Sequence, residues 1–129
     1  MKKFCFTLFC FLLMSACNAS AELNLSERDN DKQITASTGD IITISLNANA
    51  TTGYSWKFTG TPSSAYEVID ESYKVNPHPE GMVGVGGKTF YKIKLLQKGK
   101  LIIKAQYFRP WEEFNPQTDK NLRFIIEIK

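Results

Sequence analysis

Most of the chain alternates hydrophobic and polar residues with a period of two, the pattern of β-strands that have one buried face. Tyr54, Trp56 and Phe58 place three aromatic rings on one such face. This alternation and the extended stretches beside it predict strands at 23–25, 33–37, 41–46, 54–58, 65–75, 88–96, 101–108 and 122–128.

Turn-forming residues separate these stretches and define their connections. Gly60 and Pro62 mark residues 59–64 as a loop, and two prolines keep residues 76–81 out of a sheet. No segment shows a helical period, a repeat or low complexity. About seven strands separated by turns over roughly 100 residues are typical of an immunoglobulin-like sandwich. We therefore predict one all-β domain over residues 22–129, an immunoglobulin-like β-sandwich of about seven strands.

Residues 1–21 have the composition of a secretory signal peptide. Met1-Lys2-Lys3 supplies a positive start, and the run from Phe4 to Met14 is mostly apolar. That run is too short to span a bilayer, which takes a helix of about 20 residues. Ala19-Ser20-Ala21 forms an A-x-A cleavage site. Cleavage there leaves a mature chain that begins at Glu22.

A second cleavage site lies in the same segment. Met14-Ser15-Ala16-Cys17 resembles a bacterial lipobox, which would make a lipidated Cys17 the first mature residue. Methionine is unusual three places before that cysteine, so we favour the A-x-A cut. The expected location is the periplasm or the exterior, with a lipid-anchored envelope protein as the alternative. A lipid on Cys17 is the one membrane contact that we expect.

Cysteine content and charge narrow the function classes. All three cysteines fall at or before Cys17, so the A-x-A cut leaves neither a disulfide framework nor a thiol nucleophile. The signal segment also holds two of the 16 basic residues, Lys2 and Lys3, so that 14 basic residues face 13 acidic ones in the mature chain. A nearly neutral chain gives no basis for nucleic-acid binding.

Catalytic and metal-binding chemistry has little support in the sequence. His78 is the single histidine and lies between two prolines, without the partners of a catalytic triad. Histidines and cysteines at the spacing of a zinc site are missing. Adjacent carboxylates such as Glu112 and Glu113 point to opposite faces of an extended chain. We expect no enzyme, no metal and no cofactor.

Three loops carry the residues that we predict to form one binding edge. In a Greek-key sandwich, alternate loops gather at the same end. Stiff threonines make a compact wedge, glycines let the backbone approach a partner closely, and Trp and Arg are enriched in binding hot spots. The candidate binding residues are Asn49, Thr51, Thr52 and Gly53; Gly84, Val85, Gly86 and Gly87; and Arg109, Pro110 and Trp111.

The chain resembles the chagasin-type inhibitors of papain-like cysteine peptidases (family I42) in three motifs. These are Asn49-x-Thr51-Thr52-Gly53-Tyr54, Gly84-x-Gly86-Gly87 and Arg109-Pro110-Trp111, in the family's order and approximate spacing. The resemblance covers essentially all of residues 22–129. It implies an immunoglobulin-like fold and a tight, reversible, non-covalent block of the cleft of a papain-like cysteine peptidase. We expect the protein to be a monomer.

The resemblance also implies a role for each loop. Thr51 and Thr52 would sit at the catalytic cysteine, with Gly53 shaping the turn. Residues 84–87 would pair their backbone along the unprimed side of the cleft. Arg109 and Trp111 would clamp the primed side.

Two positions of the first motif differ in what they imply. Tyr54 belongs to the aromatic alternation, so we expect it to anchor the loop rather than contact the partner. Ala50 stands where the family commonly has proline. The missing ring predicts a loss of pre-organisation of about 0.4–1 kcal/mol, which weakens affinity without abolishing the function.

An exported β-sandwich binding module, of carbohydrate or adhesin type, is the alternative function. In that case Trp111 and nearby aromatic rings would form a platform for a sugar. A purely structural envelope domain is a third interpretation, for which neither peptidases nor glycans would bind.

Overall fold

The computed structural model describes residues 20–129, so that Cys17 and most of the predicted signal peptide lie outside the described residues. Strands and single-turn 3-10 helices alternate with loops along this part of the chain. The strands are β1 (Glu22–Ser26), β2 (Gln33–Ala36), β3 (Ile41–Ala48), β4 (Ser55–Thr61), β5 (Tyr66–Val75), β6 (Gly87–Leu95), β7 (Gly99–Phe108) and β8 (Lys120–Ile128). The 3-10 turns are η1 (Glu27–Asp29), η2 (Ala50–Thr52) and η3 (Ser63–Ala65).

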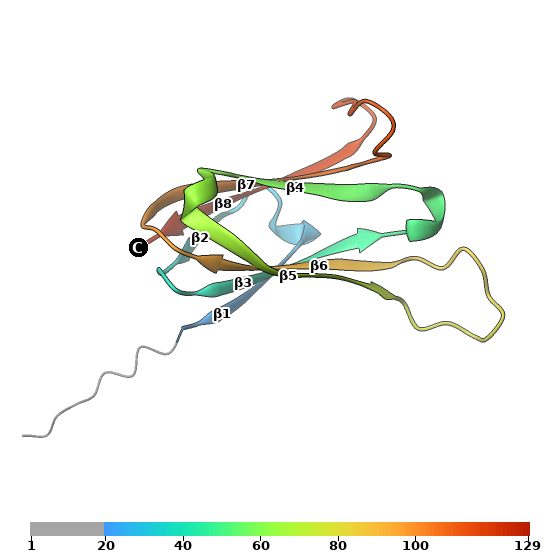
Figure 1. Cartoon of the computed structure of the whole chain (residues 1–129), viewed down its shortest axis with the longest axis horizontal. Helices are drawn as coiled ribbons and strands as arrows, with labels where there is room; N and C mark the ends of the chain where they lie inside the picture. Colours follow the sequence, from blue (N-terminus) through green and yellow to red (C-terminus); the bar gives the residue numbers. More distant parts are fainter. Residues whose placement is uncertain (1–19) are drawn as a thin grey trace, which may run out of the picture.

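The strands form two four-stranded sheets that pack face to face (Figure 1). One sheet has the order β1-β3-β6-β5 and the other the order β2-β8-β7-β4. The β1–β3 and β2–β8 pairings are parallel, and the other four are antiparallel. The predicted immunoglobulin-like sandwich is confirmed. It has eight strands because both short N-terminal stretches pair at sheet edges.

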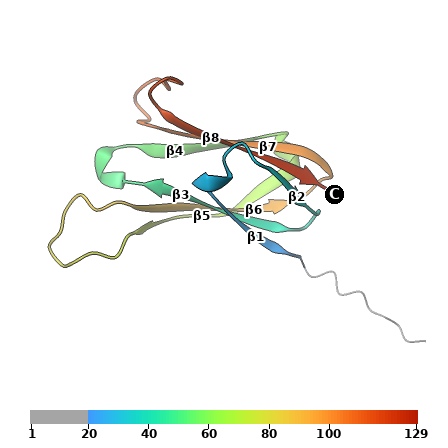
Figure 2. The ribbon, with the colours of Figure 1, turned by 180° about the vertical axis from the view of Figure 1, so that it is seen from behind.

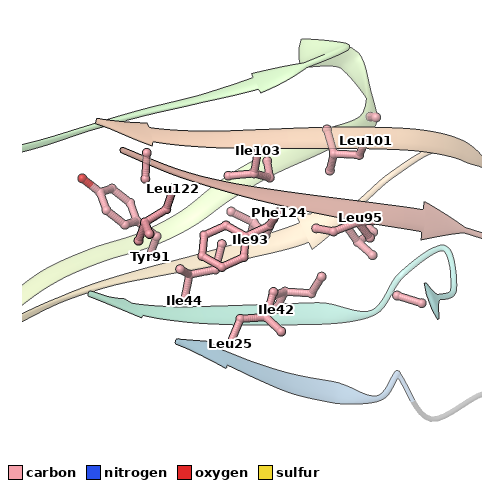
Figure 3. Close-up of a cluster of buried hydrophobic side chains, with 14 of the residues drawn as sticks. Leu25, Ile42, Ile44, Tyr91, Ile93, Leu95, Leu101, Ile103, Leu122 and Phe124 are labelled. Atoms are coloured by element: carbon pink, nitrogen blue, oxygen red, sulfur yellow. The ribbon is translucent and has the colours of Figure 1, made fainter. Parts of the chain in front are cut away.

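The core is built from the alternating residues of the central strands (Figure 3). Ile42, Ile44 and Leu46 of β3 are fully buried in one sheet, and Phe124 and Ile126 of β8 are fully buried in the other. Burying a side chain of this size contributes roughly 1.5–3 kcal/mol. The period of two in the sequence therefore decides which face of each sheet turns inward.

The prediction that residues 59–64 form a loop is wrong for its first half. Strand β4 continues to Thr61, and Gly60 pairs with Ile103 of β7. A Cβ on Gly60 would overlap the Tyr66 ring and would lie 2.8 Å from Ile103 Cδ1. Glycine is therefore present here because a neighbouring ring packs on the strand, and it does not end the strand.

The two ends of the sandwich differ in content. The β3–β4, β5–β6 and β7–β8 connections lie at one end in both views, and the C-terminus lies at the other (Figures 1 and 2). Strand β1 begins at the end that holds the C-terminus. Between residues 20 and 129 no helix is long and apolar enough to cross a membrane. Because the β3–β4, β5–β6 and β7–β8 connections lie at the same end, the predicted gathering of three loops is a property of the fold.

We predict that Gly60→Ala lowers the free energy of unfolding by about 1–3 kcal/mol, the usual range for inserting a methyl group into packed space. Alanine forms strands at least as well as glycine, so a loss arises from the contact with Tyr66. Urea unfolding measures it. The matched control is Thr59→Ala on the exposed neighbouring position, which should stay within about 0.5 kcal/mol of the parent. Equal stability of both variants would contradict the packing role.

Candidate functional site

The candidate site consists of three loops at one end of the sandwich. We call residues 49–54 the first loop, residues 76–86 the glycine loop and residues 109–119 the tryptophan loop. The first loop joins β3 to β4 and thus passes from one sheet to the other. The glycine loop joins β5 to β6 within one sheet, and the tryptophan loop joins β7 to β8 within the other. All eleven predicted binding residues lie in these loops, except Gly87, the first residue of β6.

The first loop is a single 3-10 turn whose hydrogen bonds come mainly from Asn49. The Asn49 Oδ1 atom accepts from the Thr51 N–H at 3.0 Å, as in a helix cap. The Thr52 hydroxyl donates to the Asn49 carbonyl oxygen at 2.7 Å. Gly53 ends the turn with a φ of 80°, in the left-handed region that favours glycine. The turn is therefore closed at both ends, with exposed Thr51 and Thr52 at its surface.

The first loop is tied to both of its neighbours. The Asn49 Nδ2 atom donates to the Gly84 carbonyl oxygen of the glycine loop at 3.2 Å. The Arg109 Nε atom of the tryptophan loop donates to the Thr52 carbonyl oxygen at 3.2 Å. These two bonds join three segments that are far apart in the sequence into one edge.

The tryptophan loop presents a largely exposed indole beside the first loop. Trp111 is 72% exposed, yet its ring edge lies so close to Gly53 that a Cβ there would be 2.6 Å from Trp111 Cη2. The Arg109 guanidinium lies 4.7 Å from the Tyr54 ring centre, and one of its NH groups is 3.6 Å from a Glu112 carboxylate oxygen. A glycine is therefore required at position 53 for two reasons: its positive φ ends the turn, and its missing side chain leaves room for the Trp111 ring.

Three glycines lie in or beside the glycine loop and contribute to it in different ways. Gly84 has a φ of 70°, so its backbone conformation favours glycine. The Gly86 carbonyl oxygen accepts from the Asn76 N–H at 2.9 Å and closes the base of the loop. Gly87 is buried and pairs with Val75 in the β5–β6 ladder. Gly84 and Gly86 therefore shape the loop, whereas Gly87 lies beneath it.

Sequence reasoning did not single out two exposed apolar residues in the glycine loop. Met82 is 58% exposed and Val83 is 91% exposed, close to the candidate Gly84. Large side chains this exposed are typical of interaction surfaces when they gather in one place. The sequence carried a signal, because both are apolar residues inside a segment already predicted to be a loop.

The described residues contain little that resembles a catalytic or metal centre. Within residues 20–129 no three His, Cys, Asp or Glu side chains come together as a metal site would require. His78 lies exposed in the glycine loop, where its Nδ1 atom is 2.8 Å from the Asn76 carbonyl oxygen. The site is therefore a surface of braced loops, suited to binding another macromolecule.

Comparisons with known proteins identify the class to which such a surface belongs. Residues 35–128 match the family model described as "Chagasin family peptidase inhibitor I42". Amoebiasin-2 of Entamoeba histolytica is 34% identical over 129 residues, which are the whole of both chains. The crystal structure of the cysteine protease inhibitor EhICP2 from Entamoeba histolytica is 30% identical. It covers 85% of this chain and 97% of that one, with a TM-score of 0.75.

The fold and the sequence thus define a peptidase inhibitor. The chain belongs to the chagasin family, and the predicted resemblance is confirmed. Because that family consists of inhibitors, the prediction that the chain is not an enzyme is confirmed as well. PbICP-C, solved in complex with falcipain-2, shares the fold, with 18% identity over 87% of this chain and 92% of that one and a TM-score of 0.54.

We predict that Asn49→Asp loosens the glycine loop selectively. Aspartate keeps the oxygen that caps Thr51 but loses the amide that donates to the Gly84 carbonyl oxygen. Backbone ¹⁵N relaxation should show increased mobility in residues 80–86, with the turn at Thr51 unchanged. Ser55→Ala, on an exposed position just beyond the loop, is the control. Unchanged relaxation in the glycine loop of the aspartate variant would show that this bond does not hold the loop.

Proposed function

We propose that this protein is a tight, reversible, non-covalent inhibitor of papain-like cysteine peptidases. In this proposal its three loops fill the active-site cleft of the enzyme. Family membership supports peptidase inhibition, and the similar EhICP2 is described as a cysteine protease inhibitor. The observation that carries the proposal is the pair of bonds from Asn49 to Gly84 and from Arg109 to Thr52. These bonds make one preformed edge of three loops.

Each loop has a part in the proposed complex. Thr51 and Thr52 meet the catalytic cysteine, on a turn held by Gly53. Residues 84–86 lie along the unprimed side and offer backbone groups, with Gly87 supporting them from below. Arg109, Pro110 and Trp111 hold the primed side.

Rigidity explains why the inhibitor would remain uncut in the cleft. Peptide-bond cleavage needs a carbonyl carbon placed about 3–3.5 Å from the nucleophile with its orbitals aligned. The turn at residues 49–53 is fixed by its own hydrogen bonds, and its backbone runs as a 3-10 helix instead of an extended substrate. The loop therefore occupies the site without presenting a bond in the attack geometry.

The partner in this proposal is one peptidase molecule per inhibitor, and the inhibitor is a monomer. PbICP-C, which shares the fold, was solved with falcipain-2. Titration of papain and of a cathepsin L-like peptidase with the purified protein tests the function directly. Near one-to-one inhibition, with the inhibitor recovered uncut, is the expected result. A folded sample that inhibits neither enzyme would overturn the proposal.

We predict that Trp111→Ala raises the inhibition constant at least about 30-fold, the size expected for a hot-spot tryptophan. The indole is 72% exposed, so its removal should leave the thermal unfolding midpoint within a few degrees of the parent. Leu96→Ala removes an apolar side chain, 41% exposed, at the opposite end of the sandwich and should inhibit normally. The double variant Thr51→Ala/Thr52→Ala should lose inhibition too. Full inhibition by folded Trp111→Ala protein, or by the folded double threonine variant, would refute the site.

Export completes the proposal, and it rests on the predicted signal peptide at residues 1–21. Ala21 is part of the described fold: its N–H donates to an Asp40 carboxylate oxygen at 3.0 Å, and its carbonyl oxygen accepts from the Ile41 N–H at 3.0 Å. The A-x-A cut removes both bonds, whereas a cut before Cys17 keeps them. Intact mass of the exported protein distinguishes the two N-termini.

We predict that a chain that begins at Glu22 unfolds about 1–2 kcal/mol more easily than one that begins at Cys17, because it lacks the two bonds of Ala21. Urea unfolding of the two unlipidated forms provides the measurement. A third form that begins at Ser20 keeps Ala21 and should match the longer one. Equal stability of all three forms would show that Ala21 contributes nothing to the fold.

A further inference from the structure

Two successive backbone N–H groups at the start of the first loop end on tyrosine hydroxyls. The Asn49 N–H donates to Tyr107 Oη at 2.9 Å, and the Ala50 N–H donates to Tyr73 Oη at 3.4 Å. We propose that Tyr73 and Tyr107 are positioning residues that hold the first loop in its inhibitory shape. This inference rests on the proposed function of that loop. Neither tyrosine lies in the three motifs.

The two hydroxyls meet a need that any helical turn has at its start. The first N–H groups of such a turn lack partners within the turn, and each must find another acceptor. Here the Asn49, Ala50 and Thr51 N–H groups bond in succession to Tyr107, to Tyr73 and to the Asn49 side chain. Side chains from the body of the sandwich therefore complete the turn.

Tyr107 is fixed by the aromatic face of β4. It lies on β7, two residues before Arg109, and pairs with Trp56 in the ladder. Its ring is stacked on that of Trp56 at 4.8 Å between centres and lies 5.3 Å from that of Tyr54. Few rotamers remain open to a ring held on two sides, so its hydroxyl is a rigid acceptor.

Tyr73 reaches the loop from the opposite sheet, because β5 and β7 belong to different layers (Figure 1). Gly87 makes room for it: a Cβ at that position would overlap the Lys74 carbonyl oxygen and lie 2.8 Å from Tyr73 Oη. The Lys74 backbone alone requires a glycine at position 87, and the Tyr73 hydroxyl lies in the space that the missing side chain leaves.

Held from both sheets, the first loop cannot tilt toward either one without losing a bond. The Tyr73 bond can also be isolated, since Ala50 is the first residue of η2, where proline fits well. Asn49 before it is extended, with φ −136° and ψ 100°, close to the region that the residue before a proline prefers and far from the α region that it avoids. Ala50→Pro therefore suits the backbone of the loop, removes the N–H that donates to Tyr73 Oη, and places its Cδ where the Tyr73 hydroxyl must turn away into solvent.

The test is a cycle of four full-length proteins: the parent, Tyr73→Phe, Ala50→Pro and the double variant. In the parent background, Tyr73→Phe should raise the inhibition constant for papain roughly two- to fivefold, the effect of one long hydrogen bond. In the Ala50→Pro background the same substitution should cause no loss of inhibition, because the bond is already absent. Tyr107→Phe should cost about tenfold, because its bond is shorter.

Amide hydrogen exchange without any peptidase gives a second readout, which keeps this inference separate from the proposed function. Tyr73→Phe should speed amide exchange at Ala50, and Tyr107→Phe should speed it at Asn49. Each factor should be similar to the change that the same variant causes in the inhibition constant. If papain is not inhibited by the parent, the proposed function falls and exchange still decides the tyrosine contacts. Tyr66→Phe, at the other end of β5 against Phe58, is the control and should alter neither readout.

Two results would overturn the inference. One is an equal loss of inhibition on Tyr73→Phe with and without proline at position 50, which would mean that the hydroxyl acts elsewhere. The other is unchanged exchange at Ala50 and Asn49 in the phenylalanine variants. An effect of Tyr73→Phe that is present in the parent and absent with proline at position 50, together with faster exchange, supports the positioning role.

Discussion

The hydrogen bonds of Asn49 are the constraint on which the binding edge depends. Its side-chain oxygen caps the turn at Thr51, its side-chain nitrogen reaches the Gly84 carbonyl oxygen, and its own carbonyl oxygen accepts from the Thr52 hydroxyl. Its N–H ends on Tyr107. One residue thus joins the first loop to itself, to the glycine loop and to the body of the sandwich. The asparagine amide carries its acceptor and its donor on separate atoms, so it can bond to Thr51 and to Gly84 at the same time.

The sandwich supplies this residue with fixed surroundings. Strand register places Tyr107 opposite Trp56 in one sheet and Tyr73 opposite Thr89 in the other. The first loop connects the two sheets, so its shape depends on the distance between the two layers. That spacing is set by a packed core of side chains such as Ile44, Ile93 and Phe124, and packed cores yield little to small forces. The rigidity of the loops is therefore inherited from the core.

Much of this arrangement could be predicted from the sequence, and the parts that could not share one cause. Period-two alternation fixed the inward faces, and the loop motifs indicated the family. The predicted end of β4 is wrong because a glycine in the sequence indicates a turn. The contact between Gly60 and Tyr66 that explains this glycine is visible only in the folded structure. Tyr73 and Tyr107 were overlooked for a similar reason. A tyrosine on a strand is ordinary, and its bond to a distant N–H depends on register across both sheets.

Stiffness without covalent cross-links follows from the same design. Residues 20–129 contain no cysteine, so no disulfide braces the loops of the described domain. Each brace is a hydrogen bond or a ring contact that contributes about 0.5–1.5 kcal/mol. Such bonds are individually weak, but those at Asn49 and Arg109 meet in one turn, and the turn can move only if several break together. A wedge held in this way loses little conformational entropy on binding, because its ordering is completed when the domain folds.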